Sequence, residues 1–248
     1  MSLIRKTDAV TRRSLGAGAA GAALTLLVSL PSGLLAQQGS GIPDLEAVWQ
    51  RSGRAITPEH LALNARGAAM QQAIDEFQHP MYDCVPAAIP HVLGDPYNFS
   101  IEQLADRVNI HYEKDDITRT VWLEGHGHPA AKSSDFSVQG FSTGRYEDGD
   151  LIVVTDHFTY DPSGLEDKPP MVPSSTSKKV TERYSRDGDV LTVDATVEDR
   201  RFLTAPAVFK FQFKPTDAPL EEWIECDPSQ ASNALRYIPE QELKYGIR

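Results

Sequence analysis

Apolar and polar residues alternate with a period of two through much of the second half of the chain. Four apolar residues alternate with polar ones over 191–197, and three phenylalanines alternate with lysine and glutamine over 209–213. Successive side chains of a strand leave opposite faces, so this pattern predicts half-buried β-strands. Similar segments lie near 99–104, 107–113, 117–124, 140–147, 150–157, 179–186 and 220–226.

Two dipeptides suited to tight two-residue hairpins, Asp148-Gly149 and Asp187-Gly188, separate pairs of these segments. About nine short strands joined largely by hairpins indicate an antiparallel meander. We therefore predict a mainly β protein that forms an up-and-down barrel of about 8–9 strands, with a β-sandwich as the alternative.

The chain before the strands has a different pattern. A linker follows residue 36 and is expected to start a short helix at Pro43–Gln50, and Thr57-Pro58-Glu59 is typical of a helix start, which predicts a helix over about 58–78. Three prolines over 84–96 indicate irregular backbone. We expect residues 37–96 to pack on a barrel domain of residues 97–228, followed by a tail over 229–248.

The segment 159–178 contains four prolines and is too long for an ordinary hairpin loop. Long loops of this kind are usually functional. We expect a flap over one mouth of the barrel.

The first 36 residues are typical of an export signal. Arg5, Lys6, Arg12 and Arg13 precede a Gly/Ala/Leu-rich stretch over 16–30, and small or helix-breaking residues at 31–33 come before a possible cleavage site after Ala36. The stretch Thr11–Gly16 resembles the twin-arginine motif. We expect a cleaved twin-arginine signal peptide over 1–36 and a periplasmic or secreted protein; a retained N-terminal membrane anchor is the alternative.

The chain is acidic, with 35 Asp+Glu against 24 Lys+Arg and a formal net charge of −11. Removal of the signal takes away four basic residues and one acidic residue, which makes the charge −14. Such a surface repels phosphates, so nucleic acids and anionic membranes are not expected partners. No apolar run after the signal is long enough to span a bilayer, and the pattern leaves the oligomeric state open.

Two cysteines, Cys84 and Cys226, lie after the signal. In an oxidising compartment a pair of cysteines most simply forms one disulfide, which would tie the segment before the barrel to its last part. A reactive thiol or a metal-binding thiolate pair is the alternative, but neither cysteine stands in a Cys-x-x-Cys context.

Several motifs follow one another in a recognisable order: Cys84–Pro90, Gly144–Glu147 running into Asp150–Thr155, Thr181–Tyr184 and Glu222–Cys226. Together they resemble a family of uncharacterised secreted bacterial proteins that have a predicted lipocalin-like (calycin) β-barrel. The likeness spans about residues 56–228 and implies the fold but no activity. The chain departs from the family pattern at His126, where an arginine is usual, at Tyr146, where a tryptophan is usual, and at His157, where a small residue is usual.

Arg119 shares a strand face with Val121 and Leu123. An arginine at an inward apolar position must be paired or bind an anion, because an unpaired buried charge is very costly. Glu182 is the obvious partner, since it shares its face with Tyr184. Alternatively, Arg119 faces a cavity and holds a carboxylate, enolate or carbonyl oxygen of a ligand.

Histidines gather after the predicted strand 117–124. His126 and His128 are spaced i, i+2 in Gly125-His126-Gly127-His128-Pro129, and His157 follows Asp156 at the end of another strand. Three readings stay open: these histidines bind a divalent metal, exchange protons near neutral pH, or belong to a solvated turn.

Aromatic side chains are candidates for lining a pocket, although most aromatic residues of a small barrel belong to its core. Ser142 stands in Gly140-Phe141-Ser142-Thr143-Gly144, which has Gly-x-Ser-x-Gly spacing, but no recognisable base lies at a fixed spacing from it, so nucleophilic catalysis is not favoured. No pair of carboxylates is distinguished as that of a glycosidase. The predicted substrate-binding residues are Trp122, Tyr146, Asp156, Phe158 and Tyr184.

These patterns favour an exported barrel that binds a small apolar or aromatic molecule. It would be a lyase or isomerase if Arg119, with Glu182 as its partner among the catalytic candidates, orients an oxygen of the ligand while His126, His128 or His157 exchanges a proton. The alternatives are a non-catalytic ligand carrier and a hydrolase that uses a divalent metal on His126, His128 and His157. No organic cofactor is predicted.

Overall fold

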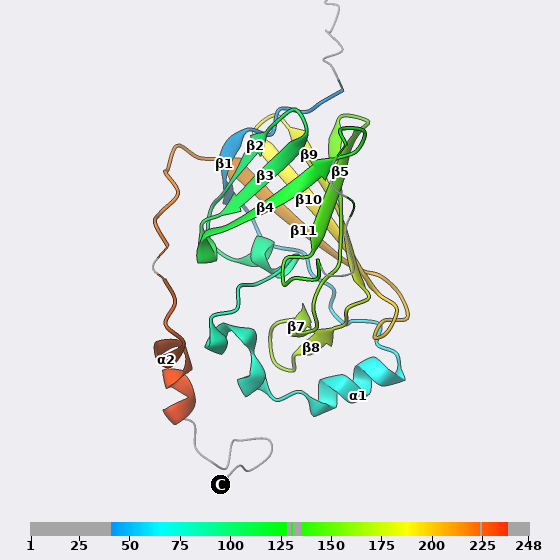
Figure 1. Ribbon diagram of the computed structural model, residues 1–248, viewed down its shortest axis with the longest axis vertical. Coiled ribbons are helices and arrows are strands. Elements are labelled where there is room, and N and C mark those ends of the chain that lie inside the picture. The colour runs from blue at the N-terminus through cyan, green and yellow to red at the C-terminus, as the bar shows by residue number, and fades with distance from the viewer. Residues whose placement is uncertain (1–40, 128–129, 131–134, 224, 238–248) are drawn as a thin grey trace, which may run out of the picture. The chain divides into compact units, whose positions relative to one another are not determined.

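The computed structural model describes residues 41–127, 130, 135–223 and 225–237. Within this part of the chain, nine strands form a closed barrel (Figure 1), and the predicted mainly β barrel fold is confirmed. The order around the barrel is β1-β11-β10-β9-β6-β5-β4-β3-β2. The strands are β1 (Ala47–Arg51), β2 (Phe99–Gln103), β3 (Arg107–Tyr112), β4 (Ile117–Leu123), β5 (Phe141–Glu147), β6 (Asp150–Asp156), β9 (Lys178–Asp187), β10 (Val190–Asp199) and β11 (Ala207–Pro215).

One neighbouring pair, β4 with β5, is parallel, and the other neighbours in the barrel are antiparallel. An odd number of strands cannot alternate in direction all the way round a closed ring, so a parallel pair is required. The long connection over 124–140 returns the chain to the start of β5 and makes this pair possible.

Two predicted elements at the ends of the barrel are wrong. Residues 43–50 were expected to start a helix, but β1 forms there, and Trp49 is fully buried where it pairs with Phe99 on β2 and Pro215 on β11. The stretch 220–226 is not a strand in its described residues. Because β1 already pairs with β11, no free sheet edge remains after β11 for another strand.

Inward-facing side chains of the barrel are buried and form one continuous core. The apolar residues of the alternating patterns that predicted β10 and β11 point inward, as expected. Leu191, Val193 and Ala195 are fully buried. Phe213 packs edge-on against Phe99, with ring centres 4.8 Å apart. Full burial of a large apolar side chain contributes about 1.5–3 kcal/mol. These positions are therefore the main source of stability.

The segment before β2 contains α1 (Ala65–Ala73), which is shorter than the predicted helix over 58–78. Asn64 caps α1 by accepting a hydrogen bond from the Gly67 amide. Before the cap, Ile56 and Leu63 form isolated bridges with Lys210 and Leu203, so this stretch follows the barrel in extended form. Four short 3-10 segments lie further along: η1 (Glu76–Gln78), η2 (Pro80–Asp83), η3 (His91–Gly94) and η4 (Lys114–Asp116).

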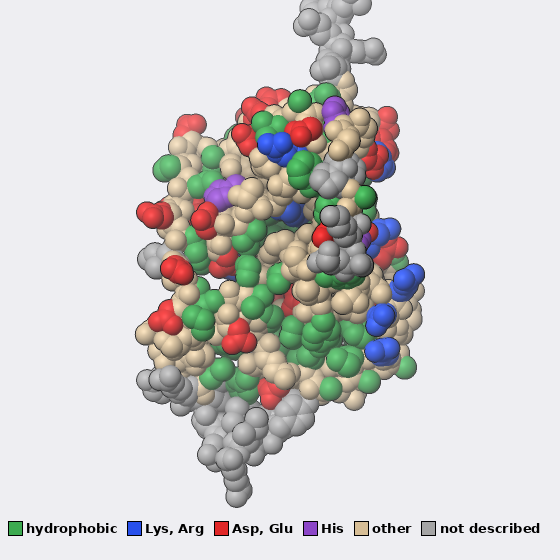
Figure 2. Space-filling model, in the orientation of Figure 1, with side chains coloured by type: hydrophobic (Ala, Val, Ile, Leu, Met, Phe, Trp, Pro, Cys, Tyr) green, Lys and Arg blue, Asp and Glu red, His purple; other side chains and the backbone are tan. Residues whose placement is uncertain are grey.

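The predicted flap forms a second, two-stranded sheet of β7 (Asp161–Glu166) and β8 (Val172–Ser174). It leaves β6 and returns to β9 at one end of the barrel, and Figure 1 shows it beneath that end together with α1. Leu165 and Val172 are buried and belong to the barrel core cluster. On the face shown in Figure 2, apolar side chains gather over the lower half, with acidic side chains among them.

After β11 the chain runs along the outside to α2 (Pro228–Ala231) and η5 (Ser232–Tyr237) (Figure 1). Cys226, just before α2, forms the predicted disulfide with Cys84. Among the described residues, no helix is long and apolar enough to cross a bilayer.

Candidate ligand-binding site

Arg119 and Glu182 form the predicted ion pair inside the barrel. Nη2 of Arg119 donates to both carboxylate oxygens, at 3.1 and 2.9 Å, and the Tyr184 hydroxyl donates to Oε1 of Glu182 at 2.8 Å. Arg119 is 4% exposed and Glu182 is fully buried. The interpretation of these residues as a buried pair is therefore confirmed.

The surroundings of this pair keep Arg119 charged. Burial lowers the pKa of Arg119, but Glu182 and the two nearby tyrosines outweigh it, so the pKa is raised. Burial raises the pKa of Tyr112 to about 12 and that of Tyr184 well above its usual value. Among the described residues, Nε and Nη1 of Arg119 and the Tyr112 hydroxyl have no hydrogen-bond partner. The catalytic roles of Arg119 and Glu182 stay predictions, and neither side chain lines the cavities described below.

The predicted aromatic residues are distributed over both sides of the barrel wall. Trp122 faces outward, where the Arg107 guanidinium lies 5.9 Å from its ring centre. Tyr146 is inward and partly buried, and its hydroxyl accepts a hydrogen bond from Gln103 at 2.8 Å. Phe158 is buried at the end of the barrel. Trp122 is therefore separated from the interior that the other aromatic residues share, and their binding role stays a prediction.

Two of the three predicted metal-binding histidines lie in the described chain, and His128 lies outside it. His126 is exposed, three residues beyond Leu123, which pairs with Gly144; His157 follows Asp156, which pairs with Phe141. The two β5 partners, Gly144 and Phe141, are three residues apart along the strand, which corresponds to about 10 Å. Among the described residues, no group of three side chains that could hold a metal ion is present.

Asp156 and His157 do come together. Nδ1 of His157 lies 2.5 Å from Oδ1 of Asp156, and the Phe136 ring packs against the imidazole with ring centres 5.0 Å apart. The two residues line a groove of about 390 Å³ with Thr176, Lys179 and Arg200 among its walls. A carboxylate on Nδ1 holds the Nδ1–H tautomer and leaves Nε2 available to take a proton.

A larger cavity of about 410 Å³, which we call the mouth cleft, lies beside the end of the barrel. It lies among η2, η3, η4, β7 and the segment that carries Cys226. Its apolar lining includes Met81, Val85 and Trp223, and the disulfide forms part of its wall. Its polar and charged lining is His79, His91, Asp95, Lys114, Asp115, Asp161, Ser163 and Asp167.

Both imidazoles of the mouth cleft are kept neutral near pH 7. Burial lowers the pKa of His79, and Nδ1 of His79 accepts a hydrogen bond from the Met81 amide. Burial lowers the pKa of His91 to about 4, although Asp167 lies only 3.8 Å from its Nδ1. Nε2 of His91 is buried and, in the described part of the chain, has no hydrogen-bond partner.

The carboxylates of the mouth cleft outnumber its cations. Nζ of Lys114 lies 3.2 Å from both Asp95 and Asp115; burial lowers the pKa of Lys114, but these carboxylates outweigh it and raise that pKa. Asp161 accepts hydrogen bonds from the amide and the hydroxyl of Ser163. Among the described lining residues, Lys114 is the only lysine or arginine against four aspartates.

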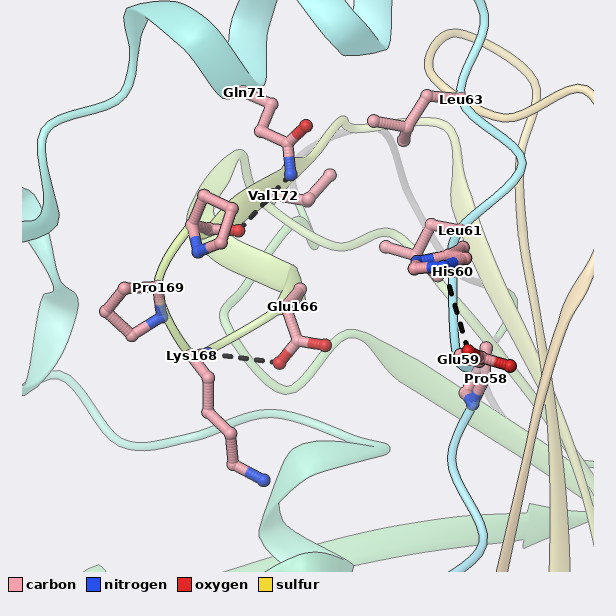
Figure 3. A pocket seen from close by; sticks show the side chains of 11 residues that line it. Pro58, Glu59, His60, Leu61, Leu63, Gln71, Glu166, Lys168, Pro169 and Val172 are labelled. Atoms are coloured by element: carbon pink, nitrogen blue, oxygen red, sulfur yellow. Dashed lines mark hydrogen bonds and ion pairs between the residues drawn. The ribbon is translucent and has the colours of Figure 1, made fainter.

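A smaller cavity of about 280 Å³ lies between residues 58–63 and the turn of the β7–β8 sheet (Figure 3). Gln71 on α1 donates to the Pro170 carbonyl at 3.3 Å and closes one side. Six of its lining residues are apolar and five are polar or charged, but two of these five, Glu59 and His60, have side chains that are about 90% exposed. The mouth cleft is the stronger candidate.

The sequence did not single out the mouth cleft. Its residues come from four distant stretches of chain, near 79–95, 114–115, 161–167 and 223–231. The available signal was the cysteine pair, because the Cys84–Cys226 disulfide brings the first and last stretches together.

No protein-family model and no curated protein sequence matches the chain. Two solved structures are similar to it in part. A secretary abundant heat soluble (SAHS) protein from Ramazzottius varieornatus is 12% identical, with 70% of this chain and 96% of that chain covered and a TM-score of 0.36. A mutant of the fluorescent protein UnaG is 13% identical, with the same coverage and a TM-score of 0.33. The barrel assignment rests on the strand pairing of the chain itself.

Proposed function

We propose that the protein binds a small molecule in the mouth cleft, and that the molecule carries a cationic amine next to an apolar or aromatic part. The observation that carries this proposal is the lining of the 410 Å³ cavity: four carboxylates, one ammonium and two imidazoles that stay neutral. Charge of one sign in a walled cleft concentrates ligands of the opposite sign.

Two carboxylates are available to the ligand. Lys114 offsets Asp95 and Asp115, whereas Asp161 and Asp167 face the cleft with no ammonium or guanidinium within 4 Å among the described residues. The buried Lys178 ammonium interacts with Asp161 from a greater distance. These two aspartates are therefore the groups that hold the amine.

The apolar lining completes the site. Trp223 is partly exposed and is oriented by an edge-on contact with Tyr97, with ring centres 5.1 Å apart. Met81 is 55% exposed and adds a flexible apolar surface. A tryptophan face attracts a cation by about 0.5–2 kcal/mol, so an alkyl- or arylammonium ion suits this wall.

Calorimetric titration with benzyltrimethylammonium tests the proposal, with benzenesulfonate as the anionic probe of similar size. We expect saturable binding of the cation and none of the anion. D167N and D161N should each weaken binding by on the order of tenfold, because each removes one charge near the ammonium. D189N, an exposed change on the β9–β10 hairpin, is the matched control. Equal binding of both probes, or no effect of either cleft variant, rejects the proposal.

Acid/base catalysis by a lyase or isomerase is a second candidate, and the 2.5 Å contact between His157 and Asp156 favours it. His157 would remove a proton next to a carbonyl through Nε2. Exchange of the α-protons of acetophenone with D₂O, followed by NMR, tests this activity. The H157N variant should lose this exchange, whereas the control variant H60N should keep it. If the wild type exchanges these protons no faster than buffer does, the acid/base activity is rejected. A carrier would bind its ligand without such turnover.

We also propose that residues 1–36 direct export by the twin-arginine route. The Cys84–Cys226 disulfide supports an oxidising destination. In bacterial cells, a variant with both Arg12 and Arg13 changed to lysine should accumulate uncleaved in the cytoplasm. Processing and export of that variant at the normal rate rejects the route.

A further inference from the structure

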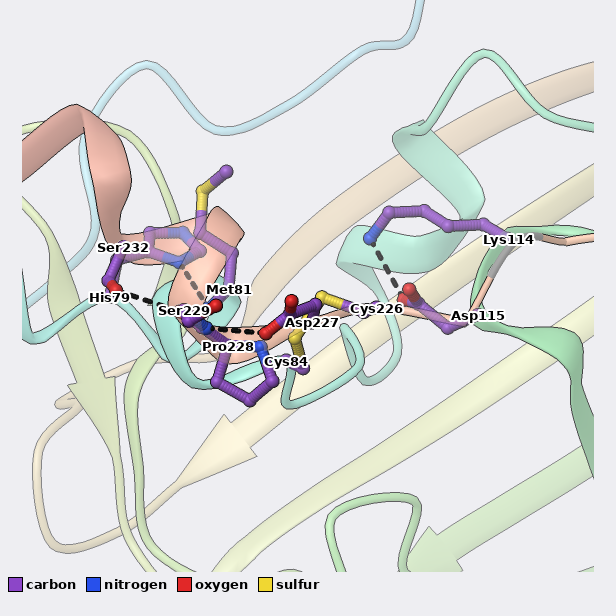
Figure 4. The surroundings of a disulfide bond; sticks show 10 residues. All are labelled: His79, Met81, Cys84, Lys114, Asp115, Cys226, Asp227, Pro228, Ser229 and Ser232. Carbon is purple, nitrogen blue, oxygen red and sulfur yellow. Dashed lines mark hydrogen bonds and ion pairs between the residues drawn. A yellow bond between two sulfur atoms is a disulfide. The ribbon is translucent and has the colours of Figure 1, made fainter.

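The segment after β11 forms one wall of the mouth cleft. We call residues 216–223 and 225–231 the C-terminal strap, and Trp223, Cys226 and Ala231 of the strap line the cleft. Figure 4 shows Cys226 bonded to Cys84, with α2 next to the segment of His79 and Met81. The ligand site is therefore complete only when the strap is in place.

Apart from the disulfide, the strap is held by the packing of α2 against η2 and by few hydrogen bonds among the described residues. None of its described residues is buried. The Thr216 amide bonds to the Val48 carbonyl at the start of the strap, and Trp223 contacts Tyr97. Around α2, the hydrogen bonds of the described residues close within the strap and η5: Asp227 accepts from the Ser229 amide, and the Ser232 hydroxyl donates to the Pro228 carbonyl. The disulfide is thus the covalent anchor of the strap, between the Trp223–Tyr97 contact and the packing of α2 on η2.

We propose that the Cys84–Cys226 disulfide is a redox latch of the mouth cleft, and that its reduction releases the strap and weakens ligand binding. This inference rests on the proposed function. A chain segment with little buried surface loses backbone entropy when it is fixed and gains little packing in return. Without the covalent link the strap is therefore released, and the barrel, which closes through β1 and β11, stays folded.

The reductant is a dithiol, such as dithiothreitol or a thioredoxin-type protein. A thiolate of the reductant attacks one sulfur of the disulfide, which forms a mixed disulfide and releases the other cysteine as a thiol after it takes up a proton. The second thiol of the reductant then releases the remaining cysteine. Two electrons pass from the dithiol to the protein disulfide, the reductant becomes a disulfide, and two protein thiols result. Cys226 is exposed, so the attacking thiolate has access.

Hydrogen exchange and calorimetry on the oxidised protein, the dithiothreitol-reduced protein and the C84S/C226S double variant test the latch. We expect amides of residues 225–231 to exchange at least tenfold faster in the last two samples, and amides of β9 and β10 to stay protected. Affinity for benzyltrimethylammonium should fall at least fivefold. S229A, a change in the strap that keeps the disulfide, is the control.

The two proposals fail separately. If oxidised protein does not bind the cation, the proposed function fails, and exchange in residues 225–231 still decides whether the latch exists. If reduction leaves that exchange unchanged, the latch is overturned. Loss of protection in β9 and β10 also overturns it, because a latch needs a folded barrel in both states.

Discussion

The ammonium of Lys178 lies 4.5 Å from the ring centre of Phe158, at the end of the barrel that the β7–β8 sheet covers. Nζ of Lys178 also donates to the Gly164 carbonyl at 3.1 Å, and the residue is 2% exposed. Burial lowers the pKa of Lys178 to about 8, against the opposing effects of Asp161 and Asp199. A charged lysine in this position costs stability at neutral pH.

The cost of Lys178 should disappear in alkaline solution. An unfolded lysine keeps its proton up to about pH 10.5, whereas folded Lys178 loses it near pH 8. Between these values the unfolded state binds more protons, so stability rises with pH. From pH 7 to pH 10 the free energy of unfolding of the wild type should rise by about 2–3 kcal/mol relative to K178M. Urea denaturation at both pH values measures this difference. K179M, an exposed change on the same strand, keeps Lys178, so its stability should rise with pH as that of the wild type does. Parallel pH profiles of the wild type and K178M would contradict the assignment.

Removal of the charge partner of Arg119 should be strongly destabilising. In E182Q the guanidinium stays buried without a counter-charge, and the expected loss is about 3–5 kcal/mol in the free energy of unfolding. E198Q breaks the exposed contact between Glu198 and Lys179 and should cost less than about 1 kcal/mol. Chemical denaturation of both variants at pH 7 compares them. Equal losses show that the barrel interior admits water around Arg119.

The barrel was predictable because its evidence is local. Alternation over 191–197 and 209–213 follows the two faces of single strands, and the inward position of Arg119 required a partner that Glu182 supplies. The strand β1 was missed because its five residues show no clear alternation: Trp49 is buried by β2 and β11, which lie about 50 and 165 positions further along the chain.

The mouth cleft was missed for a related reason. His91 and Asp167 are 76 positions apart, and neither was a candidate site residue, although the 159–178 segment that contains Asp167 was expected to form a flap. Their approach depends on how the 3-10 segments and the β7–β8 sheet pack beneath the barrel, which periodicity does not encode. In contrast, His157 and Asp156 were found because they are neighbours in the sequence.

The start of β5 should tolerate no side chain at Gly140. Gly140 has a φ of +69°, and a Cβ atom there would lie 2.5 Å from the Asp156 carbonyl oxygen. Gly149 has a φ of +85° but open space around it, so G149A measures the backbone strain alone, about 1 kcal/mol. G140A adds a steric clash and should cost a further 1–3 kcal/mol. Thermal and urea denaturation of the two variants test this, and similar losses would show that the Asp156 backbone shifts freely.

His91 should make the fold sensitive to acid. Its pKa is about 4 in the folded protein because burial disfavours the charged imidazole, and it is near 6.5 when the chain unfolds. Between these values the unfolded state binds more protons, so the stability present above pH 6.5 is lost as pH falls through 4. From pH 7 to pH 4 the wild type should lose about 3 kcal/mol more than H91Q, which cannot take up a proton at this position. H60Q, at an exposed histidine, controls for the loss of an imidazole and should follow the wild type. If H91Q and the wild type lose stability in parallel, His91 takes up its proton in the folded protein. The mouth cleft would then gain a positive charge in mild acid. That charge would release the cationic ligand proposed for the cleft.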